Sequence, residues 1–142
     1  YISGDAFVKD WIIKVRNDVP DAPVLVTAGG LLHYFEENKV ISLLRMIGQS
    51  GNMEVVFDTV NKKGMAMMQK KYMKQVGHAD AQMFFYVDAA KELAAKIRGN
   101  VKVIAEEPYY RYIPKNGLKL STKVSMAVSD QFKMVKMIHL KL

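Results

Sequence analysis

The stretch PVLVTAGGLLHYFEENKVISLLRMI, residues 23–47, decides the fold of this chain. It opens with the apolar, β-rich run VLVTA at 24–28, which is bounded by Pro23 and Gly29. Both faces of this run are apolar, as is typical of a parallel strand that is buried on both sides. We therefore predict a buried strand at 24–28.

The second part of the stretch predicts an amphipathic helix. Glu36 and Glu37 suit the positive N-terminal end of a helix, Arg45 suits its C-terminal end, and Gly48 is a suitable stop. One face of this helix is apolar and carries Val40, Ile41, Leu44 and Ile47. A buried strand followed directly by a helix is the repeating unit of an α/β fold.

Three more apolar runs predict strands: residues 53–58 (MEVVFD), 101–105 (VKVIA) and 132–142. Strands that alternate with helices indicate a doubly wound, mostly parallel sheet. The last two strands lack a strong helix between them, so we expect them to pair antiparallel. The predicted fold class is thus α/β, with an antiparallel last strand.

Helical patterns fill most of the remaining chain. Residues 64–75 are rich in methionine and lysine, and residues 89–98 carry an apolar stripe with Asp88 as their N-cap and Gly99 as their C-cap. Residues 121–130 predict a weak helix or a loop. Right-handed crossovers place such helices over the faces of the sheet.

The composition excludes several classes of protein. The chain has 142 residues, half of them hydrophobic, which is enough for one domain with a real core and excludes global disorder. No apolar run approaches the ~20 residues that span a bilayer, and no signal peptide is visible, so we expect no membrane partner. There is no cysteine, which excludes disulfides, zinc fingers and thiol nucleophiles and fits a cytoplasmic protein.

The formal net charge of +7 raises the question of nucleic-acid binding. Residues 62–74 hold five lysines beside four methionines. A helix with a lysine-rich solvent face and a methionine face over a core or acceptor pocket accounts for this pattern. Aromatic residues are not interleaved as base stacking requires, so nucleic acid is an alternative and not the expected partner.

The sequence contains no GxGxxG or GxGxG motif after a strand. It also predicts only about four strands, fewer than most doubly wound domains have. We infer that strands precede Tyr1, so that residues 1–142 form the C-terminal portion of a single domain without its cofactor-loop half. The uncovered edge of the strand at 24–28 then predicts self-association.

The order of the motifs resembles the leucine carboxyl methyltransferase family, which includes the tetracenomycin-type polyketide O-methyltransferases. The resemblance rests on residues 23–47, on DAFVKDW at 5–11 and on MEVVFD at 53–58. It continues in AEEPYYRYIP at 105–114 and SDQFKMVKMIHLKL at 129–142. It covers nearly the whole chain but only the C-terminal portion of the family's domain.

The resemblance implies a class I, S-adenosylmethionine-dependent methyltransferase fold, a seven-stranded sheet whose last strand is antiparallel. The four predicted strands would be its fourth to seventh. The resemblance further implies an O-methyltransferase of polyketide synthesis that methylates a small molecule with a hydroxyl or carboxylate group. We expect the chain alone to be inactive, because the cofactor loop is missing.

The predicted cofactor-binding residues come from two segments. The resemblance places the family's adenine-contacting aspartate at Asp5, which is followed by Ala6. Ala28, Gly29 and Gly30 end the first predicted strand, where glycines permit close approach of a ligand or simply form a tight turn. The family usually has Glu-Gly in place of this glycine pair, so a degenerate remnant with a structural role is a further alternative.

The predicted catalytic residues are His33 and Tyr34. Methyl transfer mainly requires that donor and acceptor be held in line, and a base is needed only where the acceptor loses a proton. His33 is the candidate base, with a solvated turn histidine as the alternative, and the resemblance places the family's motif tyrosine at Tyr34. Asp58 is expected to be a cap or turn residue. His78 and His139 lack partners at ligand spacing, so no metal site is predicted.

Overall fold

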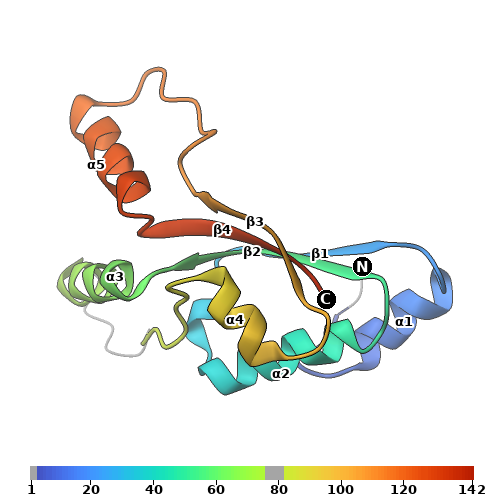
Figure 1. Cartoon of the computed structure of the whole chain (residues 1–142). Helices are drawn as coiled ribbons and strands as arrows, with labels where there is room; N and C mark the ends of the chain where they lie inside the picture. The colour runs from blue at the N-terminus through green and yellow to red at the C-terminus, as the bar shows by residue number, and fades with distance from the viewer. Residues whose placement is uncertain (1–2, 76–81) are drawn as a thin grey trace.

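The computed structural model describes residues 3–75 and 82–142 of the chain (Figure 1). The elements in chain order are α1 (Asp10–Asp18), β1 (Val24–Ala28), η1 (Leu32–Tyr34), α2 (Glu37–Gly48), β2 (Met53–Val60), α3 (Lys62–Gln75), α4 (Ala90–Ile97), β3 (Lys102–Pro108), α5 (Leu120–Gln131) and β4 (Val135–Lys141). Within the described ranges, no helix combines the length and apolar character needed to cross a membrane.

The four strands form one sheet in the order β1-β2-β4-β3. β1 pairs with β2 in parallel, whereas β4 runs antiparallel to both of its neighbours, β2 and β3. β1, β2 and β3 therefore all run in the same direction. The predicted mostly parallel α/β sheet with an antiparallel last strand is confirmed, as is the antiparallel pairing of the last two strands.

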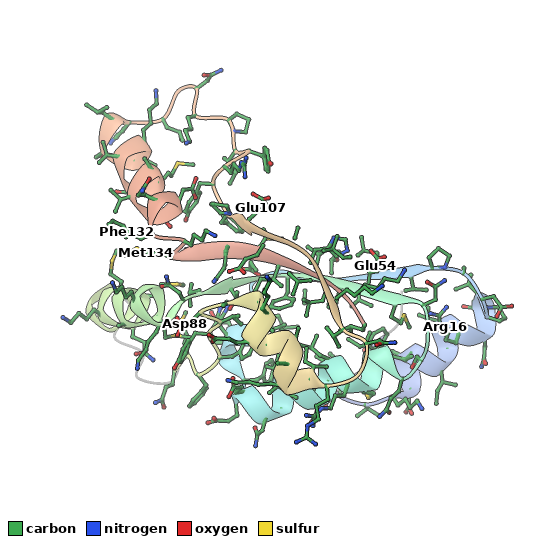
Figure 2. The ribbon with its side chains drawn as sticks, viewed as in Figure 1. Arg16, Glu54, Asp88, Glu107, Phe132 and Met134 are labelled. Carbon is green, nitrogen blue, oxygen red and sulfur yellow. The ribbon has the colours of Figure 1, made fainter. Side chains whose placement is uncertain are left out.

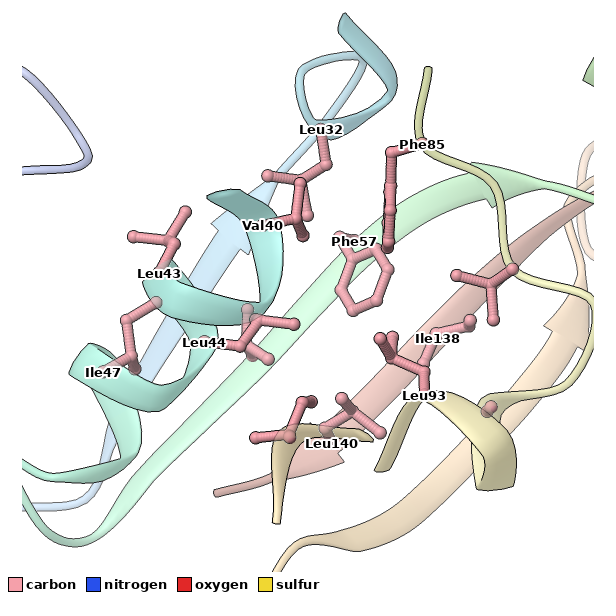
Figure 3. Close-up of a cluster of buried hydrophobic side chains, with 14 of the residues drawn as sticks. Leu32, Val40, Leu43, Leu44, Ile47, Phe57, Phe85, Leu93, Ile138 and Leu140 are labelled. Carbon is pink, nitrogen blue, oxygen red and sulfur yellow. The ribbon is translucent and has the colours of Figure 1, made fainter. Parts of the chain in front are cut away.

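Three helices, α1, α2 and α4, lie on one face of the sheet (Figure 1). The steps from β1 to β2 and from β2 to β3 cross the sheet in the same direction, so right-handed crossovers place their helices on the same side. The larger of two hydrophobic clusters forms the core between these helices and the strands (Figure 3). Its buried members include Ile12, Val40, Leu43, Leu44, Ile47, Met53, Val55, Phe57, Leu93, Ile97, Ile138 and Leu140.

The opposite face of the sheet is more exposed. Strand register places Leu25, Glu54 and Lys141 side by side on this face, with Val56 and His139 in the next row. We call these five residues the open face. Leu25 is 56% exposed, so the prediction that both sides of the run at 24–28 are buried is wrong. The apolar sequence of the strand did not reveal that the crossovers within this chain cover only one side.

The C-terminal elements differ from the expected boundaries. For residues 121–130 the helical alternative is confirmed, with a helix from Leu120 to Gln131, and the loop alternative is wrong. The last strand begins at Val135, whereas the sequence predicts residue 132. The amide of Phe132 donates to the carbonyl of Val128, and the amide of Met134 donates to that of Ser129. These bonds close the end of α5 and keep the residues before Val135 out of the strand.

Asp88 does not cap the helix that follows it. Its carboxylate accepts a hydrogen bond from the amide of Lys62 at 2.9 Å and so caps α3. α4 begins at Ala90, whose amide donates to the Glu106 carboxylate at 3.1 Å. Free amides at a helix start donate to whichever carboxylate the fold brings near. Tertiary contacts thus override the local capping pattern.

Candidate functional site

The carboxyl ends of β1, β2 and β3 lie at one edge of the sheet because these strands are parallel. Ligands of open α/β sheets bind outside this edge. We call it the carboxyl rim, marked by the strand ends Ala28, Val60 and Pro108. The predicted catalytic segment, His33 and Tyr34, directly follows the rim at β1.

A bond between neighbouring strand ends fixes the glycine pair. The amide of Gly30 donates to the Asp58 carboxylate at 2.6 Å. Gly30 has a φ of +63°, a left-handed conformation that favours glycine, and so forms a tight turn. An added Cβ at Gly29 would have no atom within 4 Å, so there is open space beside its backbone. The prediction that Asp58 is itself a cap or turn residue is wrong, because it lies within β2, which runs on to Val60, and only its side chain contacts the turn at Gly30.

His33 lies in η1 and is only 8% exposed. Its carbonyl oxygen accepts hydrogen bonds from the amides of Phe84, at 2.8 Å, and Phe85, at 3.3 Å. Burial lowers the pKa of the imidazole, and the charge of Asp58 opposes this effect in part. The alternative of a solvated turn histidine is therefore wrong. His33 is neutral near pH 7, the form in which an imidazole accepts a proton.

Tyr34 has a different environment from its neighbour. Its side chain is 40% exposed, and its ring centroid lies 4.3 Å from that of His33. The two predicted catalytic side chains are thus in contact, with the histidine inside and the tyrosine at the surface. This arrangement lets the tyrosine ring face a ligand while it shields one side of the imidazole.

The segment with Asp5 and Ala6 lies beside the end of η1. The Asp5 carboxylate accepts a hydrogen bond from the amide of Phe7 at 2.9 Å, and the Ala6 carbonyl accepts one from the Trp11 indole at 2.9 Å. The ring of Phe7 packs against that of Phe35, with 4.5 Å between their centroids. The fold therefore brings together two predicted site segments that are separated in sequence.

A cavity of about 250 Å³ lies next to η1. Its wall includes Phe84, whose amide binds the carbonyl of His33. It is lined by Glu36, Glu37, Phe84, Tyr86, Val87, Asp88, Ala89, Glu92, Leu93 and Lys96. None of the predicted site residues lines this cavity. Glu36 and Glu37 could be found in the sequence only as helix-start carboxylates, because nothing local indicates that residues 84–96 face them.

A buried ion pair lies near the rim and was missed from the sequence. Lys136 Nζ lies 2.7 Å from Glu106 Oε1 and donates to the Asp88 carbonyl at 2.7 Å, and its side chain is only 1% exposed. Burial alone would raise the pKa of Glu106, but the hydrogen bonds from Lys136 and from the Ala90 amide lower it overall. Strand alternation offered a signal, since Lys136 shares the inward face of Ile138.

The open face carries a small charged cluster. The Glu54 carboxylate accepts a hydrogen bond from His139 Nε2 at 2.7 Å and lies 3.9 Å from Lys141 Nζ (Figure 2). His78 lies outside the described residues. Within residues 3–75 and 82–142, no three side chains of histidine, cysteine, aspartate or glutamate form a metal-holding group.

Comparison with models of known protein families gives no match. A search of curated proteins also finds none. Among solved structures, the chain is similar to a DUF574 family protein from Streptomyces avermitilis MA-4680, with a TM-score of 0.64 and 10% sequence identity.

The alignment covers 99% of this chain and 54% of the neighbour, so the chain spans about half the length of that protein. At 10% identity the likeness shows the fold alone. Together with the sheet order, it supports a Rossmann-like α/β sheet.

Proposed function

We propose that this chain is the C-terminal part of an S-adenosylmethionine-dependent O-methyltransferase that acts on a small molecule with a hydroxyl or carboxylate group. The observation that carries the proposal is β4, which runs antiparallel and lies between the parallel strands β2 and β3. The motif resemblance implies such a last strand. In this proposal the protein is cytoplasmic, a location that a chain without cysteine fits.

The first strand end and the segment at residue 5 would hold the cofactor. Gly29 leaves open space beside the backbone at the rim, and the Gly30 turn is fixed by Asp58, so a ligand can approach the chain closely there. Phe7, which follows Asp5 and Ala6 in the chain, packs against Phe35 at the end of η1. When bound, the cofactor supplies a methyl group on a positively charged sulfur. In this proposal the upstream half of the domain contributes the glycine-rich loop.

His33 and Tyr34 would act on the acceptor. The neutral imidazole of His33 can take the proton that an acceptor hydroxyl releases, because burial favours its uncharged form. The exposed ring of Tyr34 would orient the acceptor beside it. Holding the acceptor and excluding water are the main tasks of these residues, since in-line transfer depends on orientation.

The deciding experiment measures S-adenosylmethionine binding by titration calorimetry. We expect little binding to residues 1–142 and clear binding to the protein extended upstream with its natural sequence. In the extended protein, Gly29→Ala should weaken binding about tenfold while the melting temperature stays unchanged, because the added methyl meets no protein atom. Tight binding by residues 1–142 alone, or none by the extended protein, would overturn the proposal.

Two alternatives have distinct signatures. A nucleic-acid module would use the +7 charge, with Lys63 and Lys70 exposed on α3, and its affinity for RNA or DNA would fall steeply with salt. A degenerate remnant would bind neither cofactor nor acceptor in the extended protein and would serve a structural role. Met65 and Met67 fit a helix that packs on one side, because Met65 is buried whereas Met67 is 60% exposed.

We also propose that residues 1–142 self-associate through β1, whose edge opposite β2 has no strand partner among the described residues. Edge strands with free amides and carbonyls pair readily with another chain. Leu25→Lys should shift the chain to monomer in sedimentation velocity. Ile104→Lys changes a similarly exposed residue on β3 and should leave association intact. A monomeric unmodified chain would contradict this proposal.

A further inference from the structure

The connection between β3 and β4, residues 109–134, forms a lobe that projects from the sheet (Figure 1). We call these residues the lobe. The amide of Tyr110 donates to the Asp130 carboxylate at 3.0 Å, and the amide of Tyr109 donates to the Val135 carbonyl at 3.1 Å. Met126 is the buried residue of α5. The lobe thus has a defined base, and most of its helix faces solvent.

An apolar ridge runs along the solvent side of α5. Residues four apart lie on one side of a helix, and Met126 projects from the opposite side. The ridge consists of Leu120, Val124, Val128 and Phe132, with exposures of 77%, 53%, 45% and 58%. Leu120 and Tyr112, the latter 76% exposed, are the most exposed large apolar side chains among the described residues. Phe132 marks the point where the ridge meets β4 (Figure 2).

The same lobe is strongly basic. Asp130 is its one acidic residue, and its carboxylate accepts a hydrogen bond from the amide of Tyr110. Five cations against one anion give the lobe a formal charge of +4, more than half of the +7 of the chain. The cations are Arg111, Lys115, Lys119, Lys123 and Lys133.

We propose that the lobe docks on an anionic lipid surface. Exposed Leu120 and Tyr112 would enter the headgroup boundary, where apolar and aromatic side chains are stabilised, while the lysines contact acidic headgroups. A second copy of the chain does not suit the surface, because two lobes of +4 repel each other. The predicted absence of a membrane partner rests on the lack of a spanning segment, which peripheral docking does not need.

The projecting shape favours this partner over a protein groove. The backbone of the lobe projects away from the sheet, so a flat bilayer can meet it without contacting the body of the molecule (Figure 1). The exposed apolar residues also extend beyond the helical ridge into the connection before it, where Ile113 and Leu118 are 39% and 37% exposed. A groove that accepts one helix face would leave these loop residues uncovered.

Cosedimentation of residues 1–142 with vesicles tests the proposal. We expect binding to phosphatidylcholine vesicles that contain phosphatidylserine, no binding to phosphatidylcholine alone, and weaker binding as salt rises. Lys119→Ala should lower the partition coefficient about fivefold, and Leu120→Ser should lower it further at high salt. These side chains are exposed, so the variants should keep their fold.

Matched variants on α3 provide the control. Lys63→Ala and Met67→Ser remove an exposed cation and an exposed apolar side chain outside the lobe, and both should leave vesicle binding unchanged. A Tyr112→Trp variant should show a blue-shifted emission with phosphatidylserine vesicles that Trp11 alone does not show. The proposal would be overturned if the chain did not bind the vesicles, which is the result expected if the lobe binds an acidic protein instead. It would also be overturned if the lobe variants and the control variants lost vesicle binding equally.

Discussion

The carboxylate of Asp58 holds the amide of Gly30 at 2.6 Å across 28 positions of sequence. This bond joins the end of β2 to the turn after β1, so the position of η1 depends on two strands rather than one. The negative charge of the same carboxylate also opposes the lowering of the His33 pKa by burial. Asp58 therefore shapes the candidate site and offsets in part the effect of burial on the pKa of its candidate base.

Asp58→Asn tests the electrostatic part of this relationship. The substitution keeps an oxygen acceptor for Gly30 but removes the charge that raises the pKa of His33, so that pKa should fall further. NMR titration of the His33 ring measures it. Glu54→Gln removes a carboxylate that contacts His139 instead and should leave the His33 titration unchanged. Equal effects of the two variants would contradict the assignment.

Asp58→Ala tests the hydrogen bond itself. Loss of a charge-assisted bond at an exposed position should lower the free energy of unfolding by about 1 kcal/mol. Urea denaturation of Asp58→Ala and Asp58→Asn separates the two contributions, because only the alanine variant leaves the Gly30 amide without its partner. An alanine variant as stable as the asparagine variant would show that the bond does not stabilise the turn.

The buried imidazole of His33 predicts a pH dependence of stability. Its pKa is lowered in the folded state, so below about pH 6.5 the unfolded chain takes up a proton first. The contribution of His33 to the free energy of unfolding should therefore decrease as pH falls below that value. Urea denaturation at several pH values should show a flatter profile for His33→Gln than for the unmodified chain. Tyr34→Phe retains the imidazole and should keep the original slope.

Breaking the buried ion pair should cost far more than breaking an exposed one. Glu106→Gln keeps an acceptor for the Ala90 amide but leaves the buried Lys136 ammonium unpaired, which should destabilise the chain by about 3 kcal/mol. Glu107→Gln breaks the exposed pair with Arg111 and should cost less than about 1 kcal/mol. Chemical denaturation compares the two variants, and similar losses would contradict the burial argument.

The same pair predicts sensitivity to acid. The pKa of Glu106 is lowered in the folded state, so its contribution is complete above about pH 4.3, the usual glutamate value, and is lost as pH falls through the lower folded value. The unmodified chain should lose stability more steeply than Glu106→Gln in this acidic range. Denaturation curves at about pH 3 and about pH 5 provide the comparison, and parallel losses in both proteins would exclude Glu106 as the cause.

Gly64→Ala should destabilise the chain although it lies within a helix. Alanine is favoured over glycine by about 1 kcal/mol in an ordinary helix interior. Here an added Cβ would lie 2.5 Å from the backbone oxygen of Met134, so the end of the lobe must shift, at a cost of about 1 to 3 kcal/mol. Gly29→Ala meets no atom and should be nearly neutral. A rise in melting temperature for Gly64→Ala would show that α3 does not pack against Met134.

The helix caps and the buried ion pair could not be predicted from the local sequence. The Asp88 pattern correctly indicates a helix nearby, but the carboxylate caps α3, while α4 uses Glu106. In the folded chain, the carboxylate that lies nearest in space to the free amides forms the cap, whether it is near or far in the sequence. Lys136 could be placed on the inward face by strand alternation, yet its partner comes from another strand. The cavity beside η1 was not predicted, because its lining residues also come from segments that are distant in sequence.

The order and type of the main elements follow from the chain itself, because strands and helices have different apolar periods and VLVTA is apolar at successive positions. The segments holding Asp5 and His33 can likewise be named from motifs. Their proximity cannot, since only packing such as the Phe7–Phe35 contact brings them together. Burial of His33, exposure of Leu25 and projection of the lobe were also decided by tertiary structure. Each depends on which segments cover a surface, and an individual stretch of sequence does not contain that information.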